Sequence, residues 1–387
     1  MLFKDIVGQE ELKSRLIQLV NKGRISHAQL FLGKMGYGSL PLAIAYAQFI
    51  SCENRGAEDS CGSCPSCLKF NKLSHPDLHF SFPFNKNEKV MDKLENVTSD
   101  YFIADWRSTV LEKPYLNIDD WHSAIDIDQK QSIITVNESK AIAKKLSLKS
   151  YESEYKFLIL WMPEKLRAEA ANKMLKLIEE PEEKTLLILV AEDADALLST
   201  ITSRTQLVRI PPIQSEKIKD YLIENKQIEE QQAEKFAQLA QGDLKEAIDL
   251  VERSEEDELF FELFKRWMRA CYKADIGAMS EWVEDASRSP MGRESQKRFL
   301  IYALEIMREG ILINYAGDQL RRMIGEEQAF MQNFAPFVHS ENIVEISELL
   351  NTAHYHISRN AYSKIVFMDM SMKFANLLRV KKRTFVS

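Results

Sequence analysis

The chain has 387 residues, a formal net charge of −7 and 28% charged residues. This length predicts two or three domains, each able to bury a hydrophobic core. The acidic balance excludes nucleic-acid binding through overall charge, so direct DNA contacts would come from local basic groups such as Lys381–Arg383 or from partner proteins. The sequence has no apolar run of about 18 residues and no signal-peptide pattern at its start, so we expect a cytoplasmic protein without membrane contact.

A glycine-rich loop follows the apolar, strand-like segment 29–32. Its glycines are Gly33, Gly36 and Gly38. The spacing matches the phosphate-binding pattern G-x-x-x-x-G-K-[ST], in which the Lys contacts the β- and γ-phosphates and the hydroxyl binds Mg²⁺. Here Ser39 stands at the Lys position and Leu40 at the hydroxyl position. We therefore predict the backbone of a nucleotide site without its reactive side chains, and we expect no ATP as a cofactor.

The segment after the loop supports this interpretation, because Pro41 suits a first helical turn and apolar residues follow it at helical spacing. An ordinary tight turn between a strand and a helix is the alternative. Backbone amides at such a turn still hold anions weakly, which leaves residual nucleotide binding open.

Four of the five cysteines lie close together in the sequence. They are Cys52, Cys61, Cys64 and Cys67. In a reducing compartment, tight C-x₂-C spacing indicates metal thiolates rather than disulfides. Four thiolates complete the tetrahedral shell of Zn²⁺ and leave no position for a reacting water, so the predicted zinc is structural. An iron–sulfur cluster and a reactive dithiol are the alternatives, although the upstream position of Cys52 differs from the ferredoxin pattern. Cys271 stands alone, and we expect it to be buried.

Three further segments have the composition of buried parallel strands. They are residues 156–162, 185–190 and 206–210. A helix is predicted at 164–180, where Pro181 ends it. Because strands and helices alternate, the sequence predicts a parallel α/β sheet up to about Ile210.

The end of the strand at 156–162 is informative about catalysis. An ATPase of this kind places acidic residues there to hold Mg²⁺ and orient water. This chain instead has Trp161, Met162 and Pro163 before Glu164. A second catalytic element is therefore missing, in agreement with the loop.

The order of these motifs resembles the bacterial clamp-loader family. The matching segments are Asp5-Ile6-Val7-Gly8-Gln9, His27-Ala28, the glycine loop, the four cysteines, His75-Pro76-Asp77, Ala170-Ala171-Asn172-Lys173-Met174-Leu175-Lys176 with Glu179-Glu180-Pro181, and Ser203-Arg204. The resemblance covers nearly the whole chain and is strongest over 1–80 and 155–212. It implies an α/β AAA+ module (a parallel sheet flanked by helices) with an inserted zinc module, a small helical lid and an all-α collar.

We accordingly expect three domains. They are an AAA+-like α/β domain at 1–211, with the cysteine module at 52–67 and an insertion at about 81–135, a helical lid at 212–254, and an all-α oligomerising collar at 255–387. A purely intramolecular helical bundle is the alternative for the collar. The insertion contains Trp106 and Trp121, and it either packs on the sheet or forms a partner-docking surface.

Within the family, the chain is similar to the members that lack ATPase activity. The resemblance implies partners in a five-subunit arc, namely ATPase subunits (gamma/tau) and a delta subunit, which load the sliding clamp onto primed DNA. It also implies that Arg204 enters the neighbouring subunit's ATP site, with Thr205 where the family usually has Cys. Arg suits this role because its charge is permanent and its guanidinium pairs with phosphate oxygens, whereas a salt-bridged surface residue is the alternative. Lys245 lies where relatives carry a sensing Arg.

Two other functions stay open from the sequence. One is an active ATPase subunit of the same complex, which Ser39, Leu40 and Trp161 oppose. The other is an unrelated zinc-bearing nucleic-acid adaptor, which the acidic balance opposes.

Overall fold

The computed structural model describes residues 1–387 except 88–89, 91–92, 128–129, 289–290, 316–325 and 381–387. The basic group Lys381–Arg383 therefore lies outside the described residues. The chain divides into two compact units, Met1–Val251 and Glu252–Ser387. No helix in the described part is long and apolar enough to cross a membrane.

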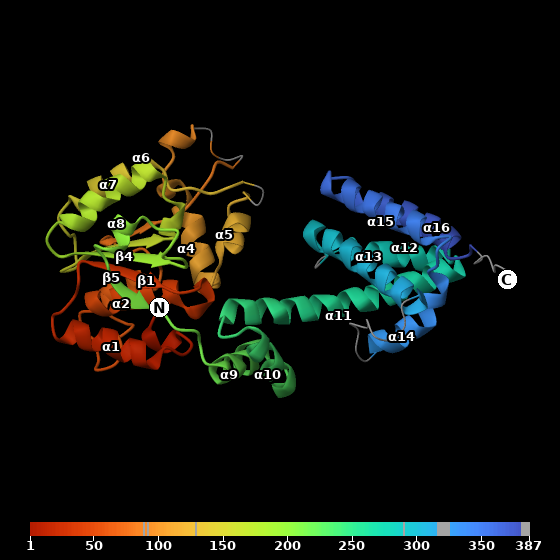
Figure 1. Cartoon of the computed structure of the whole chain (residues 1–387), viewed down its shortest axis with the longest axis horizontal. Helices are drawn as coiled ribbons and strands as arrows, with labels where there is room; N and C mark the ends of the chain where they lie inside the picture. The colour runs from red at the N-terminus through yellow and green to blue at the C-terminus, as the bar shows by residue number, and fades with distance from the viewer. Residues whose placement is uncertain (88–89, 91–92, 128–129, 289–290, 316–325, 381–387) are drawn as a thin grey trace. The chain divides into compact units, whose positions relative to one another are not determined.

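The first unit is built on a five-stranded parallel sheet in the order β2-β3-β4-β1-β5 (Figure 1). The strands are β1 (Ala28–Leu32), β2 (Leu78–Ser81), β3 (Lys156–Trp161), β4 (Thr185–Ala191) and β5 (Gln206–Arg209). Every residue of β3 and β4 is buried, as expected for central strands covered on both faces, whereas β5 is a mostly exposed edge. The predicted parallel α/β sheet is confirmed.

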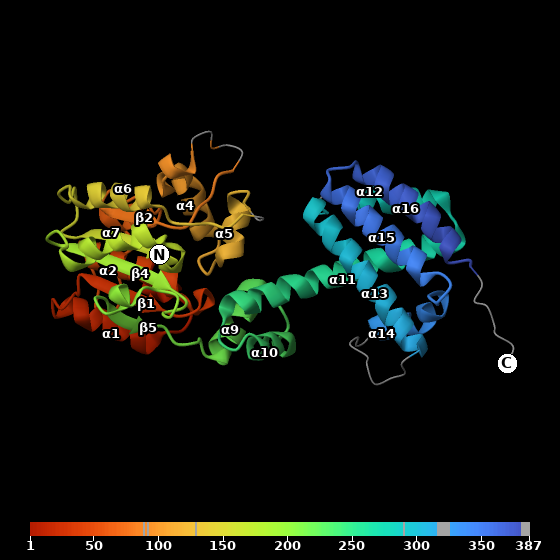
Figure 2. The same cartoon turned by 45° about the horizontal axis from the view of Figure 1, so that its top comes forward.

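Helices cover both faces of this sheet. They are α1 (Glu10–Asn21), α2 (Ser39–Ser51), α3 (Pro65–Phe70), α4 (Ile103–Glu112), α5 (Ile118–Ala124), α6 (Val136–Leu146), α7 (Ala168–Glu179) and α8 (Ser199–Thr202). After β5 come α9 (Ser215–Lys226), α10 (Glu230–Leu239) and α11 (Leu244–Lys273), and the first unit ends within α11. Apolar residues of α9, α10 and the start of α11 form a separate cluster. Short 3-10 turns add η1 (Phe3–Asp5), η2 (Met35–Tyr37), η3 (Leu94–Asn96), η4 (Ser99–Phe102) and η5 (Pro163–Lys165). The figures show α1 and α2 on one side of the sheet and α6 and α7 on the other (Figures 1 and 2).

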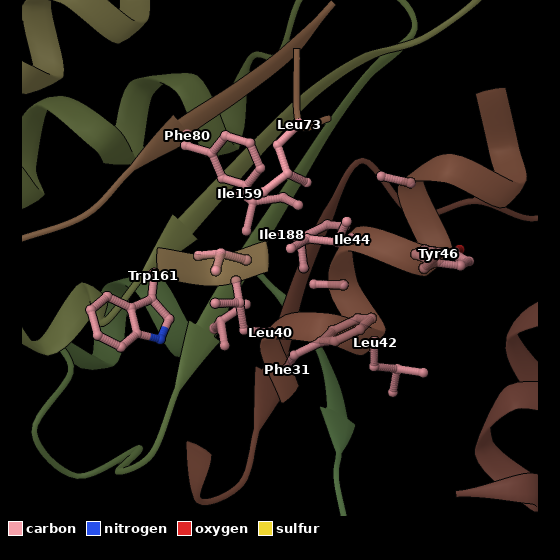
Figure 3. Packing of buried hydrophobic residues seen from close by; sticks show 14 of the residues in the cluster. Phe31, Leu40, Leu42, Ile44, Tyr46, Leu73, Phe80, Ile159, Trp161 and Ile188 are labelled. Atoms are coloured by element: carbon pink, nitrogen blue, oxygen red, sulfur yellow. The ribbon is translucent and has the colours of Figure 1, made fainter. Parts of the chain in front are cut away.

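Side-chain alternation along the strands builds the two cores. In β3, Phe157, Ile159 and Trp161 join the cluster around α2, whereas Leu158 and Leu160 join the cluster under α6 and α7. Residues 39–50 of α2 are all buried, so this helix is enclosed within the larger cluster (Figure 3).

The helix predicted at 164–180 begins later than the sequence suggests. Residues 163–165 form the turn η5, and α7 starts only at Ala168. Between them, Ile134 donates its N–H to Lys165 O and accepts from Arg167 N–H, at 2.9 and 3.1 Å. Because these backbone groups are bonded to Ile134, they are not available to a continuous helix.

Both tryptophans of segment 81–135 are buried, although Tyr101 in the same segment is exposed. Trp106 and Trp121 are both fully enclosed, and Trp106 stacks on Phe82 at 4.3 Å between ring centroids and lies 5.2 Å from Trp161. The segment therefore packs onto the end of β3. The alternative interpretation, in which these tryptophans are exposed for docking, is wrong because both side chains belong to the core.

In the second unit, every element of the described residues is helical. After α11 come α12 (Ile276–Asp285), α13 (Arg293–Tyr315), α14 (Glu326–Phe334), η7 (Ala335–Phe337), α15 (Ile343–Ser358) and α16 (Ser363–Leu377) (Figure 2). Their core contains Trp267 stacked on Trp282 at 5.2 Å and the buried thiol of Cys271, whose predicted burial is confirmed. The boundary expected between 254 and 255 falls inside the continuous helix α11.

Candidate functional site

The glycine loop connects β1 to α2 at the edge of the sheet where the strands end. Gly33 N–H continues the sheet by donating to Ala191 O of β4, at 3.0 Å. Gly38 has a φ of 88°, in the left-handed region that glycine adopts without strain, and α2 begins at the next residue. The strand–loop–helix arrangement of a phosphate-binding loop is present.

The two side chains at the reactive positions point away from any ligand. Ser39 is fully buried, and its hydroxyl lies 3.3 and 3.4 Å from the carbonyl oxygens of Gly33 and Lys34. Leu40 belongs to the same buried cluster as Phe31 and Trp161 (Figure 3). Neither position supplies a cation or a metal ligand at the loop.

Two carboxylates of this chain lie against the loop. Met35 N–H, inside the loop, donates to Glu192 Oε1 at 3.0 Å. A Cβ built on Gly36 would lie 1.7 Å from Asp243 Oδ1, so the Asp243 carboxylate rests directly on the loop. Asp243 is also the N-cap of α11, because its Oδ1 accepts the N–H of Glu246. The loop is closed by acidic side chains, which repel an anionic ligand.

Glycine is required at two loop positions for packing alone. At Gly36 it admits Asp243, and at Gly33 an added Cβ would lie 2.6 Å from Ile210 O, just beyond β5. In both cases the residue that lies close to the glycine, Asp243 or Ile210, belongs to the same chain. The glycine pattern therefore has a structural cause that does not involve phosphate.

At the end of β3, Trp161, Met162 and Pro163 precede the first acidic residue, Glu164. Trp161 is buried, and its indole N–H contacts Met35 Sδ at 3.0 Å. Glu164, the first acid after the strand, accepts the N–H groups of Glu192 and Asp193 at 2.6 and 3.0 Å. Burial raises the pKa of Glu164, although these two N–H groups oppose the shift. Its carboxylate ties the ends of β3 and β4 together, which is a structural role.

The four cysteines converge in space. Their Sγ atoms all lie within 4.8 Å of one another, and across the described residues this is the only group of His, Cys, Asp and Glu side chains found to suit a metal ion. Cys52, Cys64 and Cys67 are buried, and Cys61 is the most exposed of the four. Tetrahedral Zn²⁺ with sulfur ligands needs sulfur–sulfur separations of about 3.8 Å, so this donor set fits such an ion.

Backbone N–H groups point at the sulfur atoms. Cys61 N–H donates to Cys52 Sγ, Cys64 N–H to Cys61 Sγ and Cys67 N–H to Cys64 Sγ, at 3.3, 3.3 and 3.4 Å. N–H groups from Ser63 and Cys64 lower the pKa of the Cys61 thiol to about 6, whereas burial raises the pKa of the Cys52 and Cys67 thiols. Such bonds stabilise thiolates, which are the form that binds metal.

Arg204 lies on the surface after α8. Its side chain is 41% exposed, forms an ion pair with Glu179 of α7 and donates to Thr200 O at 3.2 Å. The guanidinium is thus accessible, and its charged partner is a surface carboxylate. Arg204, the glycine loop and the cysteines are separate features, and no hydrogen bond or ion pair found here joins them.

Sequence reasoning missed the acids that close the loop. Glu192 directly follows β4, and the carboxyl ends of parallel strands meet at one edge of the sheet, so its place beside the loop was deducible. Asp243 belongs to the Gly242–Asp243 turn before α11, and no local pattern places it against Gly36.

Comparison with known proteins identifies relatives of this chain. A family model described as DNA polymerase III, delta subunit, matches residues 8–214. The Bacillus subtilis DNA polymerase III subunit delta' is 30% identical over 218 residues, covering 55% of this chain and 52% of the relative. The Buchnera aphidicola gamma subunit is 24% identical over 257 residues, covering 65% and 58%. The chain spans about half the length of these curated relatives.

Two solved structures also align with the chain. A gamma subunit-related protein of Thermotoga maritima has a TM-score of 0.38 and 14% identity, covering 95% of this chain and 99% of that one. The Bacillus subtilis clamp loader delta protein has a TM-score of 0.36 and 12% identity, covering 95% and 100%.

Proposed function

The chain belongs to the clamp-loader family described as DNA polymerase III, delta subunit, and from this membership we propose that it is a delta-prime-type subunit that does not hydrolyse ATP. The observation that carries the proposal is the 3.0 Å contact between Glu192 Oε1 and Met35 N–H. A carboxylate at that point excludes the phosphate oxygens that need the same N–H. Ser39 and Leu40, both buried, add no compensating cation or Mg²⁺ ligand.

In this proposal, Arg204 acts on the ATP site of a neighbouring subunit. Its ion pair with Glu179 is half exposed, so exchanging that carboxylate for a phosphate costs little free energy. An arginine supplied across an interface stabilises charge that develops in phosphoryl transfer, an effect of about 10³–10⁵ in the rate of GTPases.

The proposed partners follow from the same membership. They are the gamma/tau ATPase subunits and the delta subunit in a five-subunit arc, with the sliding clamp and primed DNA engaged through that complex. The cysteine module binds one structural Zn²⁺, which cross-links residues 52–67 and supplies no reaction chemistry.

The experiment is DNA-stimulated ATP hydrolysis by the cognate gamma/tau and delta subunits, with and without this chain. We expect wild type to raise turnover and to have none alone. Arg204→Ala should fold and assemble but reduce the stimulation at least about tenfold. Arg209→Ala, an exposed arginine on the edge strand β5, is the matched control and should stimulate normally.

Three outcomes contradict the proposal in different ways. ATP hydrolysis by the isolated chain would indicate an active ATPase subunit. Full stimulation by Arg204→Ala would remove the arginine from the neighbouring site. Failure of wild type to assemble or to stimulate would favour the zinc-bearing adaptor.

A further inference from the structure

Segment 81–135 reaches the segment predicted as a lid at 212–254, of which residues up to Val251 belong to the first unit. Asp120 of α5 lies 3.2 Å from Lys245 Nζ, near the start of α11. Both side chains are largely enclosed, with 10% and 15% exposure. Lys245 also pairs with Asp249 one turn later. The cation that the sequence places at a phosphate-sensing position is therefore bound by carboxylates of the same chain.

A second contact from the same segment is apolar. Tyr115 belongs to the buried cluster of the lid, together with Ile213, Ile218 and Leu222. Its hydroxyl accepts the N–H of Val7 at 2.8 Å, so one side chain joins the lid core to the N-terminal part of the α/β domain. Residues 113–120 thus contact the lid through both charge and packing.

The glycine loop supplies a third attachment. Asp243, the cap of α11, rests on Gly36, and a Cβ at Gly36 would also lie 2.9 Å from Lys245 N. The lid therefore meets the loop where a nucleotide phosphate would otherwise lie between them. Here, Glu192 binds the loop amide and Asp120 binds the lid cation.

We propose that residues 113–120 replace the nucleotide as the link between lid and α/β domain: Asp120 holds Lys245, Tyr115 fills the lid core, and the lid stays attached without ATP. This gives segment 81–135 a function beyond covering the sheet. The inference rests on the proposed absence of bound nucleotide. A failure of this inference can be distinguished from a failure of the proposed function. Lid attachment is measured on the isolated chain, whereas stimulation of ATP hydrolysis is measured in the complex.

Geometry around Asp120 makes a clean substitution available. Asp120 Oδ2 accepts Asn117 N–H at 3.1 Å, a bond within the capping box of α5 that an Asn oxygen can still make. Asp120→Asn therefore removes the charge and keeps the helix cap. The lid contacts of residues 113–120 are made by Tyr115 and Asp120. Lys113, at the start of the segment, is 52% exposed, and its ammonium pairs with Asp120 rather than with a lid residue among the interactions found. Lys113→Gln therefore removes a charge beside Asp120 without removing a lid contact, and it is the matched control.

The test is hydrogen exchange of the full chain, comparing amides of α9 and α10 with amides of β3 and β4. Asp120→Asn and Lys245→Gln should each speed exchange in the lid helices by roughly tenfold, and the double variant should be no faster than either. Lys113→Gln should change lid exchange by less than about twofold, as expected for an exposed pair. Lys245→Arg, which keeps the charge, should retain protection.

Several results would overturn the inference. Unchanged lid exchange in both charge-removing variants would show that Asp120 does not hold the lid. Equal acceleration in β3 and β4 would show general loosening of the unit. Additive losses in the double variant would show that the two residues act independently. Extra lid protection on adding Mg·ATP to wild type would show that nucleotide, and not residues 113–120, makes the link.

Discussion

The glycine loop and the cysteine module both have the sequence pattern of a site for a small ligand, but their interiors differ. In the loop, the N–H of Met35 is bonded to Glu192, and Asp243 covers Gly36. In the module, backbone N–H groups point at sulfur, and the four Sγ atoms converge from residues 52–67. In the glycine loop, acidic side chains of the same chain occupy the space of a ligand. In the cysteine module, the four sulfur atoms are placed as ligands of one ion.

The difference shows which part of a motif reports on its ligand. Backbone shape survives in the loop because Gly33 and Gly36 are needed for the approach of Ile210 and Asp243. The backbone shape of the glycine loop is therefore weak evidence for phosphate binding. The four thiols of the module provide the complete ligand set of one metal ion, which binds them in the deprotonated form.

Of the changes that test this difference between the two sites, metal removal should have the largest effect on stability. We expect purified protein to carry one zinc per chain, and its removal by a strong chelator to destabilise the first unit by about 3 kcal/mol or more, because metal binding and local folding are coupled. Metal analysis and thermal unfolding with and without chelator measure both quantities. Cys67→Ser should lose the metal, whereas Cys271→Ser, in the second unit, should keep it.

The rival interpretations of the module give different readings in the same experiment. Visible absorbance and iron in the metal analysis would indicate an iron–sulfur cluster. Metal-free protein that is unaffected by chelator would show that the module is not a metal site.

Introducing the Lys and Thr of the phosphate-binding pattern into the loop should not produce ATP hydrolysis. In Ser39→Lys with Leu40→Thr, the new side chains start from buried positions and Glu192 still occupies the loop amide. We expect no ATP turnover and a stability loss of about 3 kcal/mol, from burying an amine and removing a core leucine. Turnover assays and denaturant unfolding test this, with wild type as the reference. Measurable ATP hydrolysis by the double variant would show that the loop is closed only by those two substitutions.

A methyl group at Gly36 should disturb the filled loop directly. In Gly36→Ala the new Cβ meets Asp243 and the backbone of Lys245, so we expect a loss of about 2 kcal/mol, typical of overpacking. Gly292→Ala is the comparison, because among the described residues no atom beyond its chain neighbours lies within 4 Å of the added Cβ. Gly292 precedes α13 at its N-cap, so this variant should cost less than about 1 kcal/mol. Equal stability of the two variants would mean that Asp243 does not rest on Gly36 in solution.

The sequence predicts the sheet and the cysteine module because both patterns are local. A buried parallel strand is a continuous apolar run, as in β3 and β4, and metal ligands follow one another at short spacing. Glu192 and Met35 are 157 residues apart, so their contact depends on the finished sheet. The sequence leaves both burial and exposure open for Trp121, because composition does not distinguish a buried aromatic residue from an exposed one.

The smallest expected effect concerns Glu164, which accepts the N–H of Glu192 and so helps to position the residue that fills the loop. Burial raises the pKa of this carboxyl above its ordinary 4.5, so the folded chain binds the proton more tightly than the unfolded chain does. This contribution to stability is fully present below pH 4.5 and is lost as the pH rises through the raised pKa.

Glu164→Gln keeps an oxygen acceptor for the two N–H groups and cannot ionise. Its stability relative to wild type should therefore improve between pH 4 and pH 7, by an amount on the order of 1 kcal/mol. Denaturant unfolding of both proteins across this range measures the difference, in which the titration of all other groups cancels. A constant difference would show that Glu164 titrates alike in the folded and unfolded chain. The hydrogen bond from the Glu192 N–H to the Glu164 carboxylate would then resemble an ordinary surface contact.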